Sequence, residues 1–405
     1  MKIVVQKFGG TSMAKQDTRL KAIEKVIKAK SKGYAPVVVV SAIGRKGDPY
    51  STDTLIDFAH SVNYSIPSRE LDLIMSCGEI ISAVIMANTL TSKGYQAMAL
   101  TGWQAGIVTD DNFGNAAIMH IKTDKIIDIL NRGYIPVIAG FQGITQDGDI
   151  TTLGRGGSDT TAVVIGEGLS AELVEIYTDV DGIMTADPRI VPDAVVLNQI
   201  SYSEVFQIAD QGAKVIHPRA VEIAMRSNIP IAIKNTMNEK PGTIVSAWCK
   251  NNAIEESYDP ECVITSIAHI TNRTQVTIEK VDDESQNRIL SLLAENDISI
   301  DLINIFPDKM IFTIDGNDTS KATKILDENS YNYSFIINCS KISAVGNRMR
   351  GIPGVMAKII SALSKYDIKV LQTADSHTTI SCLVRGEDTE KAVTSLHMEF
   401  NLCER

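Results

Sequence analysis

Short apolar runs alternate with helical periodicity through the first 246 residues of the chain. Residues 2–5 and 36–40 are apolar and rich in β-branched side chains, which is typical of strands buried on both faces of a sheet. Leu20, Ile23, Val26 and Ile27 recur between them at helical spacing. Further strands are expected at 135–139 and 173–178, and helices at 80–90, 160–168 and 203–209. This alternation predicts an α/β domain with a mainly parallel sheet and right-handed crossovers.

The pattern changes after residue 246 and then repeats itself. Residues 250–260 are polar, acidic and closed by a proline, as in a linker. The sequence LAENDI at 293–298 is matched by LSKYDI at 363–368, 70 positions later. Around the two copies we expect helices at 287–295 and 356–366, strands at 298–305 and 368–373, and hairpin returns at 310–315 and 379–384. Two tandem β-α-β-β-like units are therefore predicted.

Composition narrows the class of protein. The net charge of −10 disfavours a nucleic-acid-binding protein, which normally carries a basic face. The apolar run at 3–5 is too short for a secretory signal, and no window is expected to reach the length of a membrane helix. Six scattered cysteines, without a C-x-x-C pair, indicate reduced thiols and neither a disulfide framework nor a zinc site. A cytoplasmic protein that binds neither nucleic acid nor membrane is expected.

The segment Lys7-Phe8-Gly9-Gly10-Thr11-Ser12 lies between the first predicted strand and the first predicted helix. Two glycines let a backbone approach a phosphate closely, and Lys7 adds a mobile positive charge suited to a transferring phosphoryl group. The segment is neither a Walker loop nor a dinucleotide fingerprint. Phosphate binding and a plain strand–helix turn with a capping hydroxyl remain two open interpretations.

A second glycine turn, at 154–161, also opens a predicted helix and supplies an arginine, hydroxyls and an acid. Both turns are expected outside the carboxyl ends of strands, where open α/β sheets bind ligands. Further polar clusters lie at 178–182, 187–189 and 212–218, and Glu79 begins an apolar helix. Each of these has a structural alternative as a turn acid, a capping residue or a first-turn glutamate. His217 is interpreted as structural, because no second His or Cys lies at metal-ligand spacing.

Together these segments resemble the aspartokinase family of amino-acid kinases with C-terminal ACT domains. The matching stretches are VQKFGGTS, VVVSAIG, SCGEIIS, LTGWQAG, GFQG, TTLGRGGSDTTA, YTDVDGIMTADPRIV, GAKVIHPRAVEIA, GIPGVMAKIISALSKYDI and TADSHTTISCLV. They cover essentially the whole chain in order, and TADSHTTI is most similar to the diaminopimelate-sensitive bacterial subgroup. The resemblance implies a three-layer αβα kinase domain at 1–246, a linker at 247–262, and βαββ-type ferredoxin-like ACT units at 263–340 and 341–405.

The resemblance also implies roles for individual residues. Lys7 and Asp159 are the candidate catalytic residues. The expected ATP-binding residues are Lys7, Gly9, Gly10, Ser12, Ser41, Thr178, Asp179, Asp187, Arg189 and Lys214. The expected aspartate-binding residues are Thr52, Glu79, Arg155 and Ser158, with Glu79 at the amino group and Arg155 at the α-carboxylate. The loop at 45–50, just before Thr52, is longer than in many relatives.

The implied reaction transfers a phosphoryl group from ATP to the side-chain carboxylate of L-aspartate and gives 4-phospho-L-aspartate, the entry step to diaminopimelate, lysine, threonine and methionine synthesis. A carboxylate acceptor is already ionised at neutral pH, so positioning and charge neutralisation carry the catalysis without a general base. Mg²⁺ is expected to bridge phosphate oxygens, with no dedicated protein metal site. Two roles remain open for Asp159, one in phosphoryl transfer and one as a helix cap.

Regulation by a pathway amino acid is expected through the ACT units, which are also expected to form a homodimer or a higher oligomer. Asp301 is the candidate contact for the ammonium of the effector, and its alternative is an exposed acid at a strand edge. Diaminopimelate, lysine and threonine remain open as the effector. Two other functions also remain open: a related kinase acting on another acidic substrate, and an amino-acid sensor with an inactive kinase domain.

Overall fold

The computed structural model describes residues 1–212, 215–247, 263–346, 349 and 352–404. The chain divides into two compact units, and each is described by itself. The first unit comprises Met1–Ile183, Val196–Ala209 and Lys214–Glu255, and the second comprises Met184–Val195, Asp210–Ala213 and Glu256–Arg405. Lys214 and most of the expected linker lie outside the described residues.

The first unit is built on an eight-stranded sheet in the order β10-β12-β11-β9-β1-β2-β6-β3. Strands β3, β6, β2, β1, β9 and β11 are mutually parallel, and β12 runs antiparallel to β11. The strands are β1 (Lys2–Phe8), β2 (Tyr34–Val40), β3 (Ala97–Leu100), β6 (Ile135–Ala139), β9 (Leu173–Thr178), β10 (Gln199–Ser201), β11 (Ile231–Asn235) and β12 (Thr243–Ser246). A smaller sheet has the order β5-β4-β7-β8, with β4 (Ile107–Thr109), β5 (Ile118–Ile121), β7 (Gln142–Ile144) and β8 (Ile150–Thr152).

Helices cover both faces of the large sheet. The helices are α1 (Gly10–Ala14), α2 (Gln16–Ser31), α3 (Thr52–Val62), α4 (Ser68–Ser92), α5 (Asp124–Asn131), α6 (Gly157–Gly168), α7 (Tyr202–Asp210) and α8 (Pro218–Ser227). Apolar residues of α2 and α4 pack with Phe8, Val38 and Val40 on one face, and α6 packs against β1 and β9 from the other. Residues 37–40 of β2 are fully buried, because this strand is covered on both sides. The predicted α/β fold with a mainly parallel sheet is confirmed.

Helix α4 corrects one expectation from the sequence. It has 25 residues and an apolar 18-residue window, so by length and composition it is able to cross a membrane. Half of that window is buried inside the protein, where α4 packs against β3, β6 and β8. The helix also carries the buried acids Asp72 and Glu79. In this fold α4 is a core helix of the first unit.

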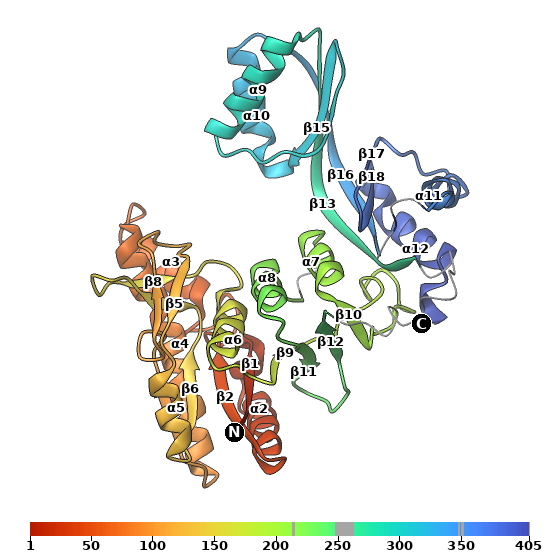
Figure 1. Ribbon diagram of the computed structural model, residues 1–405. Coiled ribbons are helices and arrows are strands. Elements are labelled where there is room, and N and C mark those ends of the chain that lie inside the picture. Colours follow the sequence, from red (N-terminus) through yellow and green to blue (C-terminus); the bar gives the residue numbers. More distant parts are fainter. Residues whose placement is uncertain (213–214, 248–262, 347–348, 350–351, 405) are drawn as a thin grey trace. The chain divides into compact units, whose positions relative to one another are not determined.

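The second unit is built on a six-stranded sheet in the order β14-β15-β13-β16-β18-β17. Its strands are β13 (Ile264–Glu279), β14 (Asp301–Ile305), β15 (Lys309–Asp315), β16 (Asn332–Gly346), β17 (Gln372–Asp375) and β18 (Thr379–Arg385). Its helices are α9 (Asp283–Glu295), α10 (Thr319–Glu328), α11 (Val355–Ser364) and α12 (Thr389–Glu399), with short 3₁₀ turns at Gly316–Asp318, Gly386–Asp388 and Leu402–Glu404. The long strands β13 and β16 run side by side through the unit (Figure 1).

These two long strands serve both repeats. β15 pairs with residues 273–279 of β13, whereas β18 pairs with residues 339–345 of β16. The first part of β13, residues 264–270, pairs with residues 341–346 of β16, most of which also pair with β18. The expected division at residue 340 therefore falls inside β16, and the start of β13 completes the sheet of the second repeat.

Candidate active site

The segment that joins β1 to α1 is a tight turn built on two glycines. The backbone N–H of Gly9 donates to the carbonyl of Tyr177 (3.3 Å), and the N–H of Gly44 donates to the carbonyl of Gly10 (3.0 Å). A β-carbon on Gly10 would lie 2.5 Å from the Gly44 carbonyl oxygen and 2.7 Å from that of Ala42, closer than real β-carbons come to other atoms. Position 10 therefore requires glycine. The turn lies at the carboxyl ends of β1, β2 and β9, where open parallel sheets bind ligands.

Lys7 and Asp159 form an ion pair beside this turn, with 2.7 Å between Nζ and Oδ1. Lys7 comes from β1, and Asp159 lies in the first turn of α6. Each side chain is only 12% exposed, so their attraction is screened by water less than that of a surface pair. Helix α6 starts after Gly156, whose φ of 68° lies in the left-handed region that favours glycine. The two glycine turns predicted from the sequence are thus brought together by this pair.

Glu79 is a buried carboxyl group of α4 at the loop that follows β2. Its Oε1 accepts a hydrogen bond from the backbone N–H of Ala42 (3.1 Å). Its Oε2 is buried and has no hydrogen-bond partner among the described residues. Burial raises the pKa of Glu79 to about 8, and the bond from Ala42 opposes this shift. Gly78 permits the close approach, because a β-carbon there would lie 2.9 Å from the side chain of Ala42.

Ser158, Arg155 and Thr52 lie on the segments that border this region. Ser158 is buried, and a β-carbon on Gly140, just after β6, would lie 2.8 Å from the β-carbon of Ser158. Arg155 is exposed, and its guanidinium makes no ion pair or hydrogen bond with any residue that the structure describes. Thr52 is the first residue of α3, which Ser51 caps by accepting from the N–H of Thr54.

The end of β9 carries Thr178 and Asp179. Thr178 donates a hydrogen bond from its hydroxyl to Asp179 Oδ1 (3.2 Å), and Arg45 pairs with Asp179 Oδ2 (2.5 Å). The Arg45 and Asp179 side chains are 72% and 51% exposed, so this pair contributes little to stability. Ser41 directly follows β2, and its N–H donates to the carbonyl of Phe8 at the end of β1, the strand between β2 and β9 (3.1 Å). Arg45 links the loop after β2 with the loop after β9, a contact that the sequence analysis did not foresee.

Ser12 is buried, and its hydroxyl lies 2.7 Å from the hydroxyl of Thr236. Thr236 directly follows β11 and lies outside every motif noted in the sequence. No local sequence signal marks it, because a threonine after a strand is common in loops.

Three of the expected ATP-binding residues lie outside the described part of the first unit. Asp187 and Arg189 belong to the second unit, where the Arg189 guanidinium donates to both carboxylate oxygens of Asp187, the shortest distance being 2.6 Å. This contact lowers the pKa of Asp187. Lys214 lies outside the described residues.

His217 supports the turn that precedes α6. A β-carbon on Gly156 would lie 2.2 Å from the β-carbon of His217, so the imidazole packs tightly there. His217 also caps α8, accepting from the N–H of Arg219 (3.3 Å). Burial lowers the pKa of His217, against the attraction of Asp159. In the described part of the chain, no three His, Cys, Asp or Glu side chains converge to hold a metal ion.

Asp301 starts β14 in the second unit and pairs with Lys341 of β16. The Lys341 side chain is 6% exposed, whereas that of Asp301 is 33% exposed. Asp301 therefore neutralises a buried ammonium group and is also partly exposed to solvent. A simple exposed acid at a strand edge would have no such buried partner.

Comparison with known proteins identifies the family of the chain. Residues 2–235 match the amino acid kinase family, and residues 334–398 match an ACT domain. Aspartokinase 1 of Bacillus subtilis is 45% identical over 404 residues, which cover 99% of this chain and 100% of the relative. The chain belongs to the aspartokinase family. The reaction of this aspartokinase is accordingly the phosphorylation of aspartate.

Solved aspartokinase structures share the fold over nearly the whole chain. Aspartate kinase of Clostridium acetobutylicum superposes with a TM-score of 0.80 at 28% identity, covering 98% of this chain and 100% of the other. Aspartokinase III of E. coli, in complex with aspartate and ADP (R-state), gives a TM-score of 0.78 at 26% identity, with 98% and 99% coverage. The same E. coli enzyme with lysine and aspartate (T-state) gives 0.75 at 25% identity, with 98% and 99% coverage.

Proposed function

We propose that the site around Lys7, Asp159 and Glu79 transfers the γ-phosphoryl group of ATP to the side-chain carboxylate of L-aspartate. The observation that carries this proposal is the shielded Lys7–Asp159 pair beside the glycine turn. The Lys7 ammonium neutralises negative charge as the phosphoryl group moves, in a site where water screens little of its field. Asp159 holds the flexible lysine side chain in place between turnovers. The acceptor carboxylate is ionised at neutral pH, so no general base is required.

Glu79 receives the amino group of aspartate in this proposal. Its unpartnered Oε2 is a buried acceptor, which an ammonium group would satisfy with a charge-assisted bond. Arg155 binds the α-carboxylate, because an exposed guanidinium without a partner among the described residues is free to form two parallel bonds. Ser158 and Thr52 complete the pocket from α6 and α3.

ATP lies along the carboxyl ends of β1, β2 and β9. Gly9 and Gly10 contact its phosphates, with Ser12 and Ser41 nearby, and the required glycine at position 10 supports a close backbone approach. Thr178 and Asp179 contact the rest of the nucleotide. On the basis of the family resemblance, we propose that the nucleotide is also bound by Asp187, Arg189 and Lys214.

Mg²⁺ accompanies ATP in this proposal. Mg²⁺ usually keeps several waters and binds through the substrate phosphates with one or two carboxylates. Asp159 would be a candidate carboxylate for such an ion, with its Oδ1 in contact with Lys7. When bound, Mg²⁺ neutralises phosphate charge.

The ACT units are proposed to bind an amino-acid end product and to reduce activity. The E. coli relative has been solved with lysine in its T-state, which supports an amino acid as the ligand of this class of regulatory unit. We propose diaminopimelate as the effector here, with Asp301 as a contact, and a homodimer or higher oligomer formed through the ACT units. A cytoplasmic location fits the free thiols at Cys77, Cys339, Cys382 and Cys403.

A coupled ADP-release assay tests the substrate assignment. We expect turnover with L-aspartate and ATP, and rates near background with L-glutamate, acetylglutamate and acetate. The assay is then repeated with diaminopimelate, lysine and threonine, with diaminopimelate expected to inhibit most. Faster turnover of another acid would contradict the assignment, and ligand binding without any turnover would indicate a sensor.

A further inference from the structure

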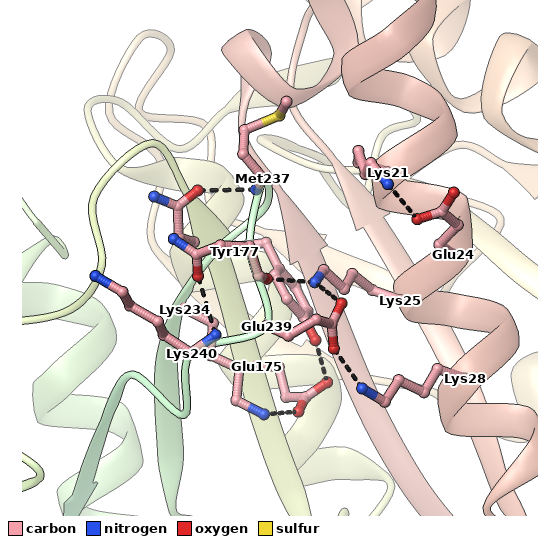
Figure 2. A network of polar contacts seen from close by, with 12 residues as sticks. Lys21, Glu24, Lys25, Lys28, Glu175, Tyr177, Lys234, Met237, Glu239 and Lys240 are labelled. Atoms are coloured by element: carbon pink, nitrogen blue, oxygen red, sulfur yellow. Dashed lines mark hydrogen bonds and ion pairs between the residues drawn. The ribbon is translucent and has the colours of Figure 1, made fainter.

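The loop between β11 and β12 is anchored to helix α2 by charged side chains. Glu239 accepts from the ammonium groups of both Lys25 and Lys28 (Figure 2). Lys25 is 5% exposed and also donates to the carbonyl of Asn238 (2.5 Å). Two ion pairs on one carboxylate restrict the loop, because any displacement separates several charges at once.

The same loop is tied to the segment that follows β9. Asp181 accepts hydrogen bonds from Asn235 (2.7 Å), Asn238 (2.8 Å) and Lys240 (2.7 Å). The ammonium of Lys240, with the two amides, lowers the pKa of Asp181. The loop is therefore held on two sides, with Thr236 at its start.

Thr236 connects this anchored loop to the glycine turn. Its backbone N–H donates to the carbonyl of Thr178 (2.9 Å), and its hydroxyl donates to the same oxygen (3.2 Å). The hydroxyl has a single hydrogen, so the Ser12 hydroxyl donates to Thr236 across the 2.7 Å contact. Ser12 and Thr236 are 3% and 2% exposed, so water offers no substitute for this bond.

The glycine turn needs such external support. Helix α1 has five residues, too few to be stable alone, and the two glycines before Ser12 leave the backbone conformationally free. We propose that Thr236 is a positioning residue for ATP. It holds Ser12, and with it the glycine turn, against the carboxyl end of β9. This inference rests on the proposed role of the glycine turn in binding the ATP phosphates.

Thr236→Val removes the hydroxyl but keeps the size of the side chain. We expect the KM for ATP to rise by about tenfold, which corresponds to the loss of one buried hydrogen bond, while the KM for aspartate changes by less than about twofold. Thr236→Ser keeps the hydroxyl and should restore the KM for ATP to within about twofold of the original enzyme. Binding of a non-hydrolysable ATP analogue, measured by calorimetry, should weaken in parallel with KM.

Thr109→Val is a matched control. Thr109 and Thr151 form another buried hydroxyl pair, with 2.6 Å between the oxygens, in the small sheet. We expect Thr109→Val to lower the melting temperature without raising the KM for ATP. Glu239→Gln is a second test on an exposed side chain, in which loosening the loop should raise the KM for ATP by about two- to threefold.

The outcomes separate this inference from the proposed function. An unchanged KM for ATP in folded Thr236→Val, or equal rises in the KM for ATP and for aspartate, overturns the positioning role. If Thr236→Val does not fold, an unchanged KM for ATP in Glu239→Gln overturns it. Near-normal turnover in folded Lys7→Ala would instead reject the proposed function, whatever Thr236 does.

Discussion

Glu79 Oε1 accepts the backbone N–H of Ala42 at 3.1 Å, while Oε2 of the same carboxyl group is buried without a partner among the described residues. Burial raises the pKa of Glu79 to about 8. Since the ionised form pairs with an ammonium group and the protonated form does not, the KM for aspartate should rise as the pH falls below about 8, by up to about tenfold per pH unit. Steady-state kinetics at saturating ATP across this pH range measures the effect.

Glu79→Gln tests the same pairing without a titrating group. We expect the KM for aspartate to rise by about ten- to hundredfold, which is the loss of one charge-assisted hydrogen bond, and to lose its dependence on pH near 8. The KM for ATP should stay within about twofold. An effect confined to ATP would show that Glu79 serves the nucleotide or the fold.

Asp72 is a structural acid that the sequence analysis did not identify. It is 1% exposed and accepts from the N–H of Thr152 (2.7 Å), the hydroxyl of Thr152 (2.8 Å) and the N–H of Gly114 (2.9 Å). Asp72→Ala leaves the buried N–H and hydroxyl of Thr152 unpaired, so we expect the free energy of unfolding to fall by about 3 kcal/mol. Urea denaturation measures the loss, and Asp72→Asn, which keeps an acceptor, should lose less. Equal stability of Asp72→Ala would show that water reaches these donors.

The role of Asp301 is tested by substitution in the full-length chain. Its carboxylate pairs with the buried Lys341. Asp301→Asn should remain active and need about tenfold more diaminopimelate for half inhibition, a coupling loss in the usual range for allosteric sites. Inhibition curves at fixed aspartate measure the shift. Equal sensitivity would remove Asp301 from the regulatory site, and inhibition by lysine alone would contradict the proposed effector.

The sequence predicts the core of the fold because buried parallel strands are nearly continuous in apolar residues. The strand at 36–40 and the helix around Ile23 are found, and the expected helix at 80–90 is the second half of α4. The sequence does not predict the first half of α4, because the charged residues Arg69, Glu70 and Asp72 near its start obscure the apolar spacing.

Contacts between segments far apart in the chain could not be predicted from the sequence. The 70-residue repeat indicates two similar units, but it does not reveal that β13 and β16 each extend through both repeats in one sheet. The strands expected at 298 and 368 start later, at Asp301 and Gln372. Glycine turns marked Lys7 and Asp159 as candidates through local chemistry. Thr236 and Arg45 act across contacts between distant segments, which no local pattern records.

The central claim is that the Lys7 ammonium neutralises the migrating phosphoryl group. The most direct test is kcat of Lys7→Ala in the ADP-release assay, with circular dichroism to verify the fold and Lys21→Ala as a control, since Lys21 is an exposed lysine of α2 that pairs with Glu24. The account predicts that Lys7→Ala lowers kcat by about a thousandfold while Lys21→Ala leaves it unchanged. Near-normal turnover by folded Lys7→Ala would contradict it.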